Sequence, residues 1–417
     1  MSIPTSDDLL SPLRDAIVNK PPYISGTLPL PSECFRLHYL HEESSNYLDL
    51  ANASEPQLAK LAEACQPATF GLNRQDVLDE SYRKAGKMDV SQFSTMLVPE
   101  RTELVKFIQE DLLDGDDALR PMRIELYKLN VYGKDSFFKT HKDTPRSESM
   151  FGSLVIVFPT EHEGGALIVR HRGEEWTFDS ARAIQDQPCP TIGFTAFFSD
   201  VDHEVSVVKA GYRVTLTYNL YYDDVHANEP TSTITRPLTS ITNFNSFKEA
   251  LDNLLANPAF LPSGGLLGFG LRHAYPIGES LDHVPKILKG SDAIVWRACT
   301  ELDLAPKVYI MYGDLKSDSE RVIVDHFVIG DTGTDDCLFP DYLVRWERAI
   351  QVERAKACNG CVDRPKGPTP VSWVVRPETT RTKLKTPWIA TGNEACLNFS
   401  YGEVCIIVDI PVADNNS

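Results

Sequence analysis

The sequence predicts an α+β fold that is mainly β, with an antiparallel barrel or jelly roll between N-terminal helices and a mixed C-terminal region. Three observations support this prediction. Short runs rich in Val, Ile, Phe, Thr and Tyr fill residues 122–222, separated by Gly, Pro, Asp and Ser turns. The spaces between these runs are too short for the crossover helices that a parallel sheet needs. Helical periodicity is confined to the regions before and after them.

The N-terminal region is expected to support this core. Residues 1–50 are rich in Pro and Ser and show little periodicity, so we expect an extended arm over the surface. A first helix should begin after Ser54, with Gln57 at the capping-box position. A second helix is predicted over 102–113, where apolar residues repeat at helical spacing.

The predicted strands of the core span 123–132, 153–158, 166–170, 175–178, 192–199 and 212–222. The following region mixes helical patterns, one around 247–255 and one beginning at Ser291, with strand-like runs at 266–271, 307–312, 321–329, 371–375 and 403–410. We therefore expect an N-terminal arm with helical support over 1–118, a core over 119–225 and a mixed α/β region over 235–417.

Composition excludes several classes of protein. The 417 residues carry a net charge of −18 and are 42% hydrophobic, which is enough for a sizeable core. The acidic balance argues against binding to nucleic acid or to an anionic membrane surface. No run approaches the ~18 apolar residues of a membrane span. The first residues lack the basic start and apolar run of a secretory signal, and the nine cysteines are consistent with free thiols. We expect an intracellular protein, cytoplasmic and/or nuclear; the sequence gives no oligomeric state.

A metal-ligand pattern follows the first predicted strand of the core. In an extended chain, residues two apart point to the same face, so His141 and Asp143 can aim at one point. His203, at the start of another strand-like run, can supply a third ligand. Two histidines and one carboxylate on one face of a metal are the arrangement used by non-heme Fe(II) oxygenases, which leave the opposite face open.

Arg213 lies ten residues after His203, on a strand whose residues alternate cleanly. Arg213, Thr215 and Thr217 share one face. An Arg that faces a barrel interior needs an anionic partner, and its planar fork matches a carboxylate. A dicarboxylate could chelate the metal at one end and meet Arg213 at the other, with a further hydrogen bond from Thr215. A zinc hydrolase on a cupin-like barrel does not explain Arg213.

These motifs, with Tyr132 to Asp143 and the run Gly164-Gly165-Ala166-Leu167, resemble the prolyl 4-hydroxylase-like 2-oxoglutarate/Fe(II) dioxygenases, and more narrowly the fungal ones. The resemblance covers about 120–222 and continues loosely through 68–71 and 79–85. It implies a double-stranded β-helix. Collagen-type prolyl hydroxylases have Lys where this chain has Arg213, which loosens the link to a collagen-like substrate.

The resemblance also implies which residues hold each cofactor. Fe(II) would be held by His141, Asp143 and His203. The far carboxylate of 2-oxoglutarate would be held by Arg213, with Tyr132 as a further contact. Dioxygen is the second co-substrate, and ascorbate is expected to stimulate turnover.

The implied activity is hydroxylation of a C–H bond in a protein or peptide residue, with release of succinate and carbon dioxide. A small-molecule (natural-product) oxygenase of the same chemistry and a 2-oxoglutarate- or oxygen-sensing binding module remain open. Arg146 and Arg170 are candidate substrate-binding residues, because a basic rim on an acidic chain favours an anionic or carbonyl-bearing group. Tyr82 and Arg83, in a charged helix-like stretch, are expected to be structural. The C-terminal region has no second set of metal ligands and is expected to be non-catalytic.

Overall fold

The chain forms two compact units, each with a hydrophobic core of its own. The central unit comprises Lys20–Leu113 and Ala118–Ile234, and the terminal unit comprises Met1–Asn19, Asp114–Asp117 and Thr235–Ser417. The computed structural model describes residues 6–42, 44–72, 75–113, 120–147, 149–185, 187–223, 238–275, 277, 280–314, 317–326, 328, 339–353, 368–377, 384–390 and 396–412. Among the described helices, none combines the length and the apolar character that crossing a membrane requires.

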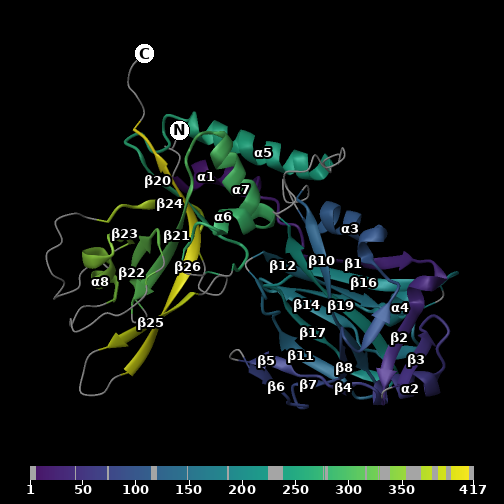
Figure 1. The fold of residues 1–417 in the computed structure, drawn as a ribbon. Coiled ribbons are helices and arrows are strands. Elements are labelled where there is room, and N and C mark those ends of the chain that lie inside the picture. Colours follow the sequence, from purple (N-terminus) through teal and green to yellow (C-terminus); the bar gives the residue numbers. More distant parts are fainter. Residues whose placement is uncertain are drawn as a thin grey trace. The chain divides into compact units, whose positions relative to one another are not determined.

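Two antiparallel sheets dominate the central unit (Figure 1). The larger has the strand order β1 (Tyr23–Pro29), β16 (Thr191–Phe198), β12 (Met150–Val157), β19 (Arg213–Tyr222), β10 (Met122–Tyr132), β8 (Gly86–Asp89) and β4 (Gln66–Pro67). The smaller has the order β15 (Glu174–Phe178), β14 (Leu167–His171), β17 (Asp202–Val205), β11 (Phe137–His141) and β7 (Arg83–Lys84). Side chains of both sheets line one cavity, so the sheets face each other. The mainly β character predicted for this region is confirmed, and the arrangement fits a β-helix fold.

Smaller elements complete the central unit. Three short sheets pair β2 (Arg36–His41) with β3 (Ser44–Asp49) and β9 (Phe93–Thr95), β5 (Phe70–Leu72) with β6 (Gln75–Val77), and β13 (His162–Gly164) with β18 (Val208–Gly211). The helices are α2 (Glu55–Glu63), α3 (Leu104–Phe107) and α4 (Ser180–Ile184), with 3-10 turns at Ser32–Phe35 and Pro99–Arg101. The predicted cap is confirmed, since Gln57 Oε1 accepts from the Ser54 backbone N–H at 2.9 Å. The helix predicted over 102–113 is only one α-turn that continues as a π-turn at Ile108–Leu112.

The terminal unit is a mixed α/β unit around one further sheet. Its order is β23 (Ile350–Glu353), β22 (Ser317–Val324), β21 (Lys307–Asp314), β26 (Cys396–Ile410), β20 (Gly265–Gly270) and β24 (Val371–Val375), and β25 (Leu384–Ala390) also pairs with β26. Its helices are α1 (Ser6–Asp15), α5 (Leu238–Leu255), α6 (Val284–Ile287), α7 (Gly290–Glu301) and α8 (Phe339–Trp346). Four of the five predicted strand-like runs of this region are present as strands, and the run at 321–329 is a strand only as far as Val324; residues 327 and 329 lie outside the described residues.

Two local expectations are wrong. The first fifty residues do not form an extended arm, because they contain α1 and the strands β1, β2 and β3. The short apolar stripe of α1 buries Leu10 and Leu13 in the core of the terminal unit, and β1 pairs with β16 along its whole length. Ser291 does not cap α7 either. The cap residue is Lys289, and Ser291 lies buried inside the first turn.

Candidate metal centre and co-substrate pocket

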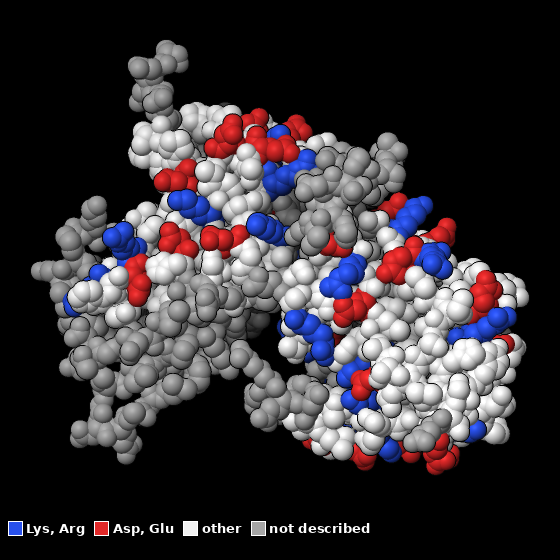
Figure 2. Space-filling model, viewed as in Figure 1, with Lys and Arg blue, Asp and Glu red and all other residues white. Residues whose placement is uncertain are grey.

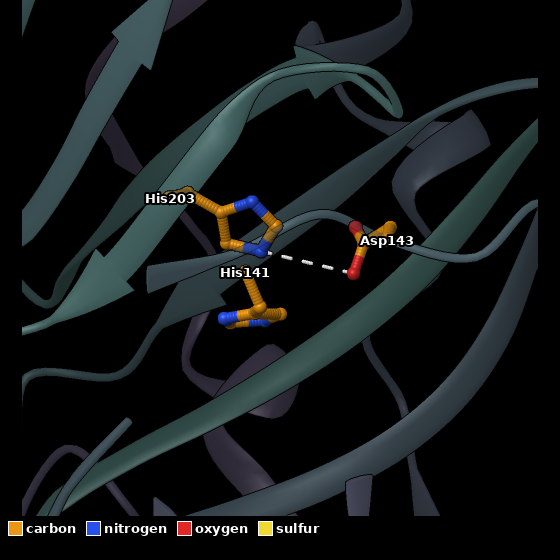
Figure 3. Close-up of side chains that lie close together, drawn as sticks. All are labelled: His141, Asp143 and His203. Carbon is orange, nitrogen blue, oxygen red and sulfur yellow. Dashed lines mark ion pairs between the residues drawn. The ribbon is translucent and has the colours of Figure 1, made fainter. Parts of the chain in front are cut away.

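Three side chains, two on neighbouring strands of the smaller sheet and one just after the end of a strand, meet at one point (Figure 3). His141 ends β11 and Asp143 follows two residues later. His203 lies on β17, directly opposite His141 in the antiparallel register, and the two ring centroids are 4.1 Å apart. His203 Nε2 lies 3.7 Å from Asp143 Oδ1. The sheet register therefore gathers one potential ligand atom from each residue within 4.8 Å of the others.

Backbone carbonyls orient both imidazoles. His141 Nδ1 lies 2.8 Å from the Lys139 carbonyl oxygen, and His203 Nδ1 lies 3.1 Å from the Val201 carbonyl oxygen. Because a carbonyl can only accept, Nδ1 carries the proton in each ring and the Nε2 lone pair remains available. Burial, together with the neighbouring His203 ring, lowers the pKa of His141 to about 3. Its imidazole is therefore neutral at physiological pH, as a metal ligand must be.

A hydrogen bond also orients the Asp143 carboxylate. The hydroxyl of Ser153, a buried residue of β12, donates to Asp143 Oδ2 at 2.5 Å. That bond fixes one carboxylate oxygen and leaves Oδ1 facing the histidines. Hydrogen bonds of this kind orient metal ligands and are part of a functional site.

Arg213 is a buried cation at the start of β19. Its side chain is 1% exposed, and its guanidinium lies 5.5 Å from the centroid of the Tyr132 ring. Its Nε has no hydrogen-bond partner, and no carboxylate of the described residues forms an ion pair with it. Burial lowers the pKa of Arg213 to about 10, so the guanidinium still carries its charge at neutral pH. An uncompensated charge in this position is costly, and a bound anion would relieve that cost.

A cavity of about 90 Å³ joins the metal-ligand cluster to Arg213. Six predicted site residues line it together: His141, Asp143, His203, Tyr132, Arg213 and Thr215. The other lining residues are Arg83, Tyr127, Lys128, Asn130, Phe138, Val155, Leu167, Phe197, Val205 and Thr217. The predicted alternation of β19 is confirmed, since Arg213, Thr215 and Thr217 all face this cavity.

The two predicted rim residues, Arg146 and Arg170, are not among the lining residues. Arg170 is held by Glu175 at 2.6 Å and by Glu204 at 3.1 Å. Arg146 packs over the ring of Tyr127, which does line the cavity, with 4.2 Å from its guanidinium carbon to the ring centroid.

Several lining residues were not identified from the sequence. Arg83 lies on β7 rather than on a helix, and it donates to the Thr69 carbonyl oxygen at 2.7 Å and to Asn130 Oδ1 at 2.8 Å. Its guanidinium carbon lies 4.3 Å from the centroid of Phe138, which stacks on His141. Alternation along β10 from Tyr132 would have indicated Asn130 and Lys128. No signal in the sequence indicates Arg83, because β7 joins the sheet through long-range pairing.

Comparison with known families agrees with this geometry. Residues 127–221 match the family model described as "2OG-Fe(II) oxygenase superfamily", and this range contains all six predicted residues that line the cavity. The chain is a 2-oxoglutarate-dependent dioxygenase. Its cofactors are Fe(II) and the co-substrates 2-oxoglutarate and dioxygen.

The residues present in the dioxygenase fit these groups. Two imidazole nitrogens and one carboxylate form a donor set suited to Fe(II). The unpartnered Nε of buried Arg213 is suited to a carboxylate, which 2-oxoglutarate carries at each end.

No curated protein matches the dioxygenase chain. Similar solved structures include a prolyl-4-hydroxylase from Pseudomonas putida, 18% identical with a TM-score of 0.30, covering 52% of this chain and 99% of that one. Another is a Trichoplax adhaerens prolyl hydroxylase in complex with a hypoxia inducible factor peptide fragment, 16% identical with a TM-score of 0.28, covering 55% and 94%. A third is a prolyl 4-hydroxylase from Phytophthora capsici, 14% identical with a TM-score of 0.24, covering 62% and 80%.

Proposed function

We propose that the enzyme hydroxylates a C–H bond of a protein or peptide residue at the cavity between the two sheets of a double-stranded β-helix. His141, Asp143 and His203 hold Fe(II). Arg213 holds the far carboxylate of 2-oxoglutarate, with Tyr132 and Thr215 beside it. The observation that carries the proposal is the convergence of all six residues on one cavity. The peptide substrate rests on the sequence resemblance to prolyl 4-hydroxylase-like enzymes.

The bound Fe(II) supplies the oxidative chemistry, in which dioxygen and 2-oxoglutarate are consumed and succinate and carbon dioxide are released. The protein positions the metal ligands and the co-substrate. The Lys139 and Val201 carbonyls and the Ser153 hydroxyl fix the directions of the three ligand side chains. Arg213 fixes one end of the co-substrate, so the other end is presented to the metal.

Apolar side chains from both sheets close the rest of the cavity. Val155 and Phe197 contribute from the larger sheet, and Leu167 and Val205 from the smaller one. Such walls exclude water, which strengthens the electrostatic contacts inside and limits side reactions. We expect the terminal unit to take no part in the chemistry, because its sequence has no second set that matches the pattern of His141, Asp143, His203 and Arg213.

The metal assignment is tested by iron content. We expect wild-type protein to hold close to one Fe(II) per chain, bound by His141, Asp143 and His203. His141→Ala, Asp143→Ala and His203→Ala should each lose the bound iron and the turnover of 2-oxoglutarate while keeping the circular dichroism spectrum of the wild type. Ser153→Ala should retain iron with roughly 10–100-fold lower affinity, as loss of a ligand-orienting hydrogen bond typically does. Wild-type turnover in both Asp143→Ala and His203→Ala, or two irons per chain, would contradict the assignment.

The substrate class is tested by product mass. Purified iron-loaded enzyme is incubated with a peptide pool and, separately, with a metabolite extract, and each is examined for the gain of one oxygen atom. Oxygen gained in the peptide pool supports the proposal. Oxygen gained only in the extract indicates a small-molecule oxygenase, and 2-oxoglutarate binding without substrate-stimulated succinate release in either pool indicates a sensing module.

A further inference from the structure

Several basic side chains of the central unit that do not line the cavity are paired with carboxylates. Arg170 pairs with Glu175 and Glu204, and Lys87 pairs with Asp89 at 3.7 Å. On the face that Figure 2 shows, acidic side chains in red and basic side chains in blue lie among one another. Cations at or beside the cavity that have no such partner are candidates to bind an anion.

Lys128 and Arg146 are two such cations. Among the described residues, no carboxylate forms an ion pair with either of them. Both contact the same aromatic ring: Lys128 Nζ lies 4.6 Å and the Arg146 guanidinium carbon 4.2 Å from the centroid of Tyr127. Arg146 also donates a hydrogen bond to the Tyr127 hydroxyl. Because that hydroxyl oxygen accepts from Arg146, its own proton remains available for an acceptor.

A β-bulge directs Tyr127 and Lys128 into the cavity. The pairing of β10 with β19 shifts register between Leu126 and Lys128, so Tyr127 is the extra residue of the bulge. In a regular strand, neighbouring residues point to opposite faces, yet Tyr127 and Lys128 both line the cavity. Bulges often re-aim a side chain beside an active site.

The backbone of this cluster lies away from Arg213 along the larger sheet. Tyr132 lies opposite Arg213, and Lys128 lies opposite Thr217, four residues back along β10. At a strand rise of about 3.3 Å per residue, these two backbone positions are about 13 Å apart. Tyr127 and Lys128 therefore line a different part of the cavity from Arg213.

We propose that Tyr127, Lys128 and Arg146 form a subsite that binds a carboxylate of the substrate next to the C–H bond that is hydroxylated. This inference rests on the proposed function. The ring of Tyr127 holds the two cations in place, and both they and its hydroxyl donate charge-assisted hydrogen bonds to the carboxylate. The carboxylate can come from an acidic side chain of a peptide or from a free carboxylic acid.

Binding to a catalytically silent form tests the subsite. Zn(II) replaces Fe(II) in the full-length protein, 2-oxoglutarate is added, and dissociation constants are measured by ligand-observed NMR. The peptide arm compares acetyl-Gly-Pro-Glu-amide with acetyl-Gly-Pro-Gln-amide. The small-molecule arm compares N-acetylproline with N-acetylprolinamide. We expect the carboxylate to bind at least about tenfold tighter than its amide in one arm, and that arm identifies the source. Equal binding within both pairs would overturn the proposal.

Variants separate a recognition role from a structural one. Lys128→Gln and Arg146→Gln should each reduce the preference for the carboxylate, and the Lys128→Glu/Arg146→Glu double variant should instead prefer acetyl-Gly-Pro-Lys-amide. A merely structural role would not invert the preference. Arg123→Gln is the matched control. Arg123 lies on the same strand, 4.2 Å over the Tyr221 ring, but it pairs with Glu125 and does not line the cavity. A control that lost the preference as strongly would also overturn the proposal.

Different results would contradict the proposed function and the proposed subsite. If the His203→Ala variant keeps both the bound iron and the 2-oxoglutarate turnover of the wild type, the proposed function is wrong. If iron and 2-oxoglutarate turnover follow the metal ligands while carboxylates and amides bind alike, only the subsite is wrong.

Discussion

Arg213 is a residue that lowers the stability of the ligand-free protein and favours the binding of a carboxylate. Its guanidinium is enclosed, and no carboxylate of the described residues pairs with it. Burial lowers the pKa of this side chain to about 10, which expresses the cost of keeping the charge away from water. The ligand-free protein bears that cost, and a bound carboxylate offsets it.

Replacement of Arg213 should therefore separate affinity from stability. We expect Arg213→Met to weaken 2-oxoglutarate binding by more than about a hundredfold, because removing one partner of a buried charge pair costs about 3–5 kcal/mol. The same variant should unfold at an equal or higher temperature than the wild type when no ligand is present, because the uncompensated charge is gone. Calorimetric titration and thermal unfolding of the metal-loaded protein measure both effects.

Arg213→Lys is the control for charge alone. It keeps a cation but loses the planar fork, so we expect affinity between those of the wild type and Arg213→Met. Identical affinity for 2-oxoglutarate in all three proteins would remove Arg213 from the co-substrate site.

At the scale of elements, the turn between β13 and β14 sets the position of Arg213. Gly165 adopts a φ of +71° in this turn, and a Cβ built there would lie 2.8 Å from Arg213 Cδ and 2.9 Å from Val208 Cγ2. Gly173, in the turn between β14 and β15, has a similar φ of +82° but nothing within 4 Å of a built Cβ. Both positions favour glycine for its backbone, whereas only Gly165 leaves room for the arginine.

Gly165→Ala should therefore raise the KM for 2-oxoglutarate severalfold, since the added methyl group displaces the Arg213 side chain. Gly173→Ala carries the same backbone strain, of order 1 kcal/mol, without touching the pocket. We expect it to lower the melting temperature slightly and to leave the KM at the wild-type value. Steady-state kinetics on the two variants decide the matter, and equal KM values would show that the contact with Arg213 has no effect on binding.

Local patterns in the sequence were sufficient to predict many of the residues that line the cavity. Strand alternation placed Arg213, Thr215 and Thr217 on one inward face, and the spacing of His141 and Asp143 placed both at one point. The bulge at Tyr127 could not be predicted, because it depends on the register that β10 adopts against β19. Arg83 was missed for a related reason: its strand, β7, is brought to β11 only by the folded sheet.

At the scale of the whole molecule, the two ends of the chain belong to the same unit. Arg14 of α1 donates to the Val374 carbonyl oxygen of β24 at 2.7 Å, a contact between residues 360 positions apart. Leu10 and Leu13 of α1 lie in the core formed by residues that follow position 235. Sequence periodicity could not predict this packing, because it reports the face of an element and not the partner of that face.

Shortening a buried side chain of α1 should destabilise the terminal unit and leave the central unit unchanged. Leu13 is fully buried, so Leu13→Ala should lower the free energy of unfolding by about 2–5 kcal/mol through lost burial and the cavity left behind. Val18, which is 41% exposed in the same segment, is the control, and Val18→Ala should change stability by no more than about 0.5 kcal/mol. Thermal unfolding with and without Zn(II) and 2-oxoglutarate identifies the transition of the central unit, because only a unit that binds the ligands is stabilised by them. We expect Leu13→Ala to lower the transition that does not respond to these ligands. A shift confined to the responsive transition would contradict the assignment of α1 to the terminal unit.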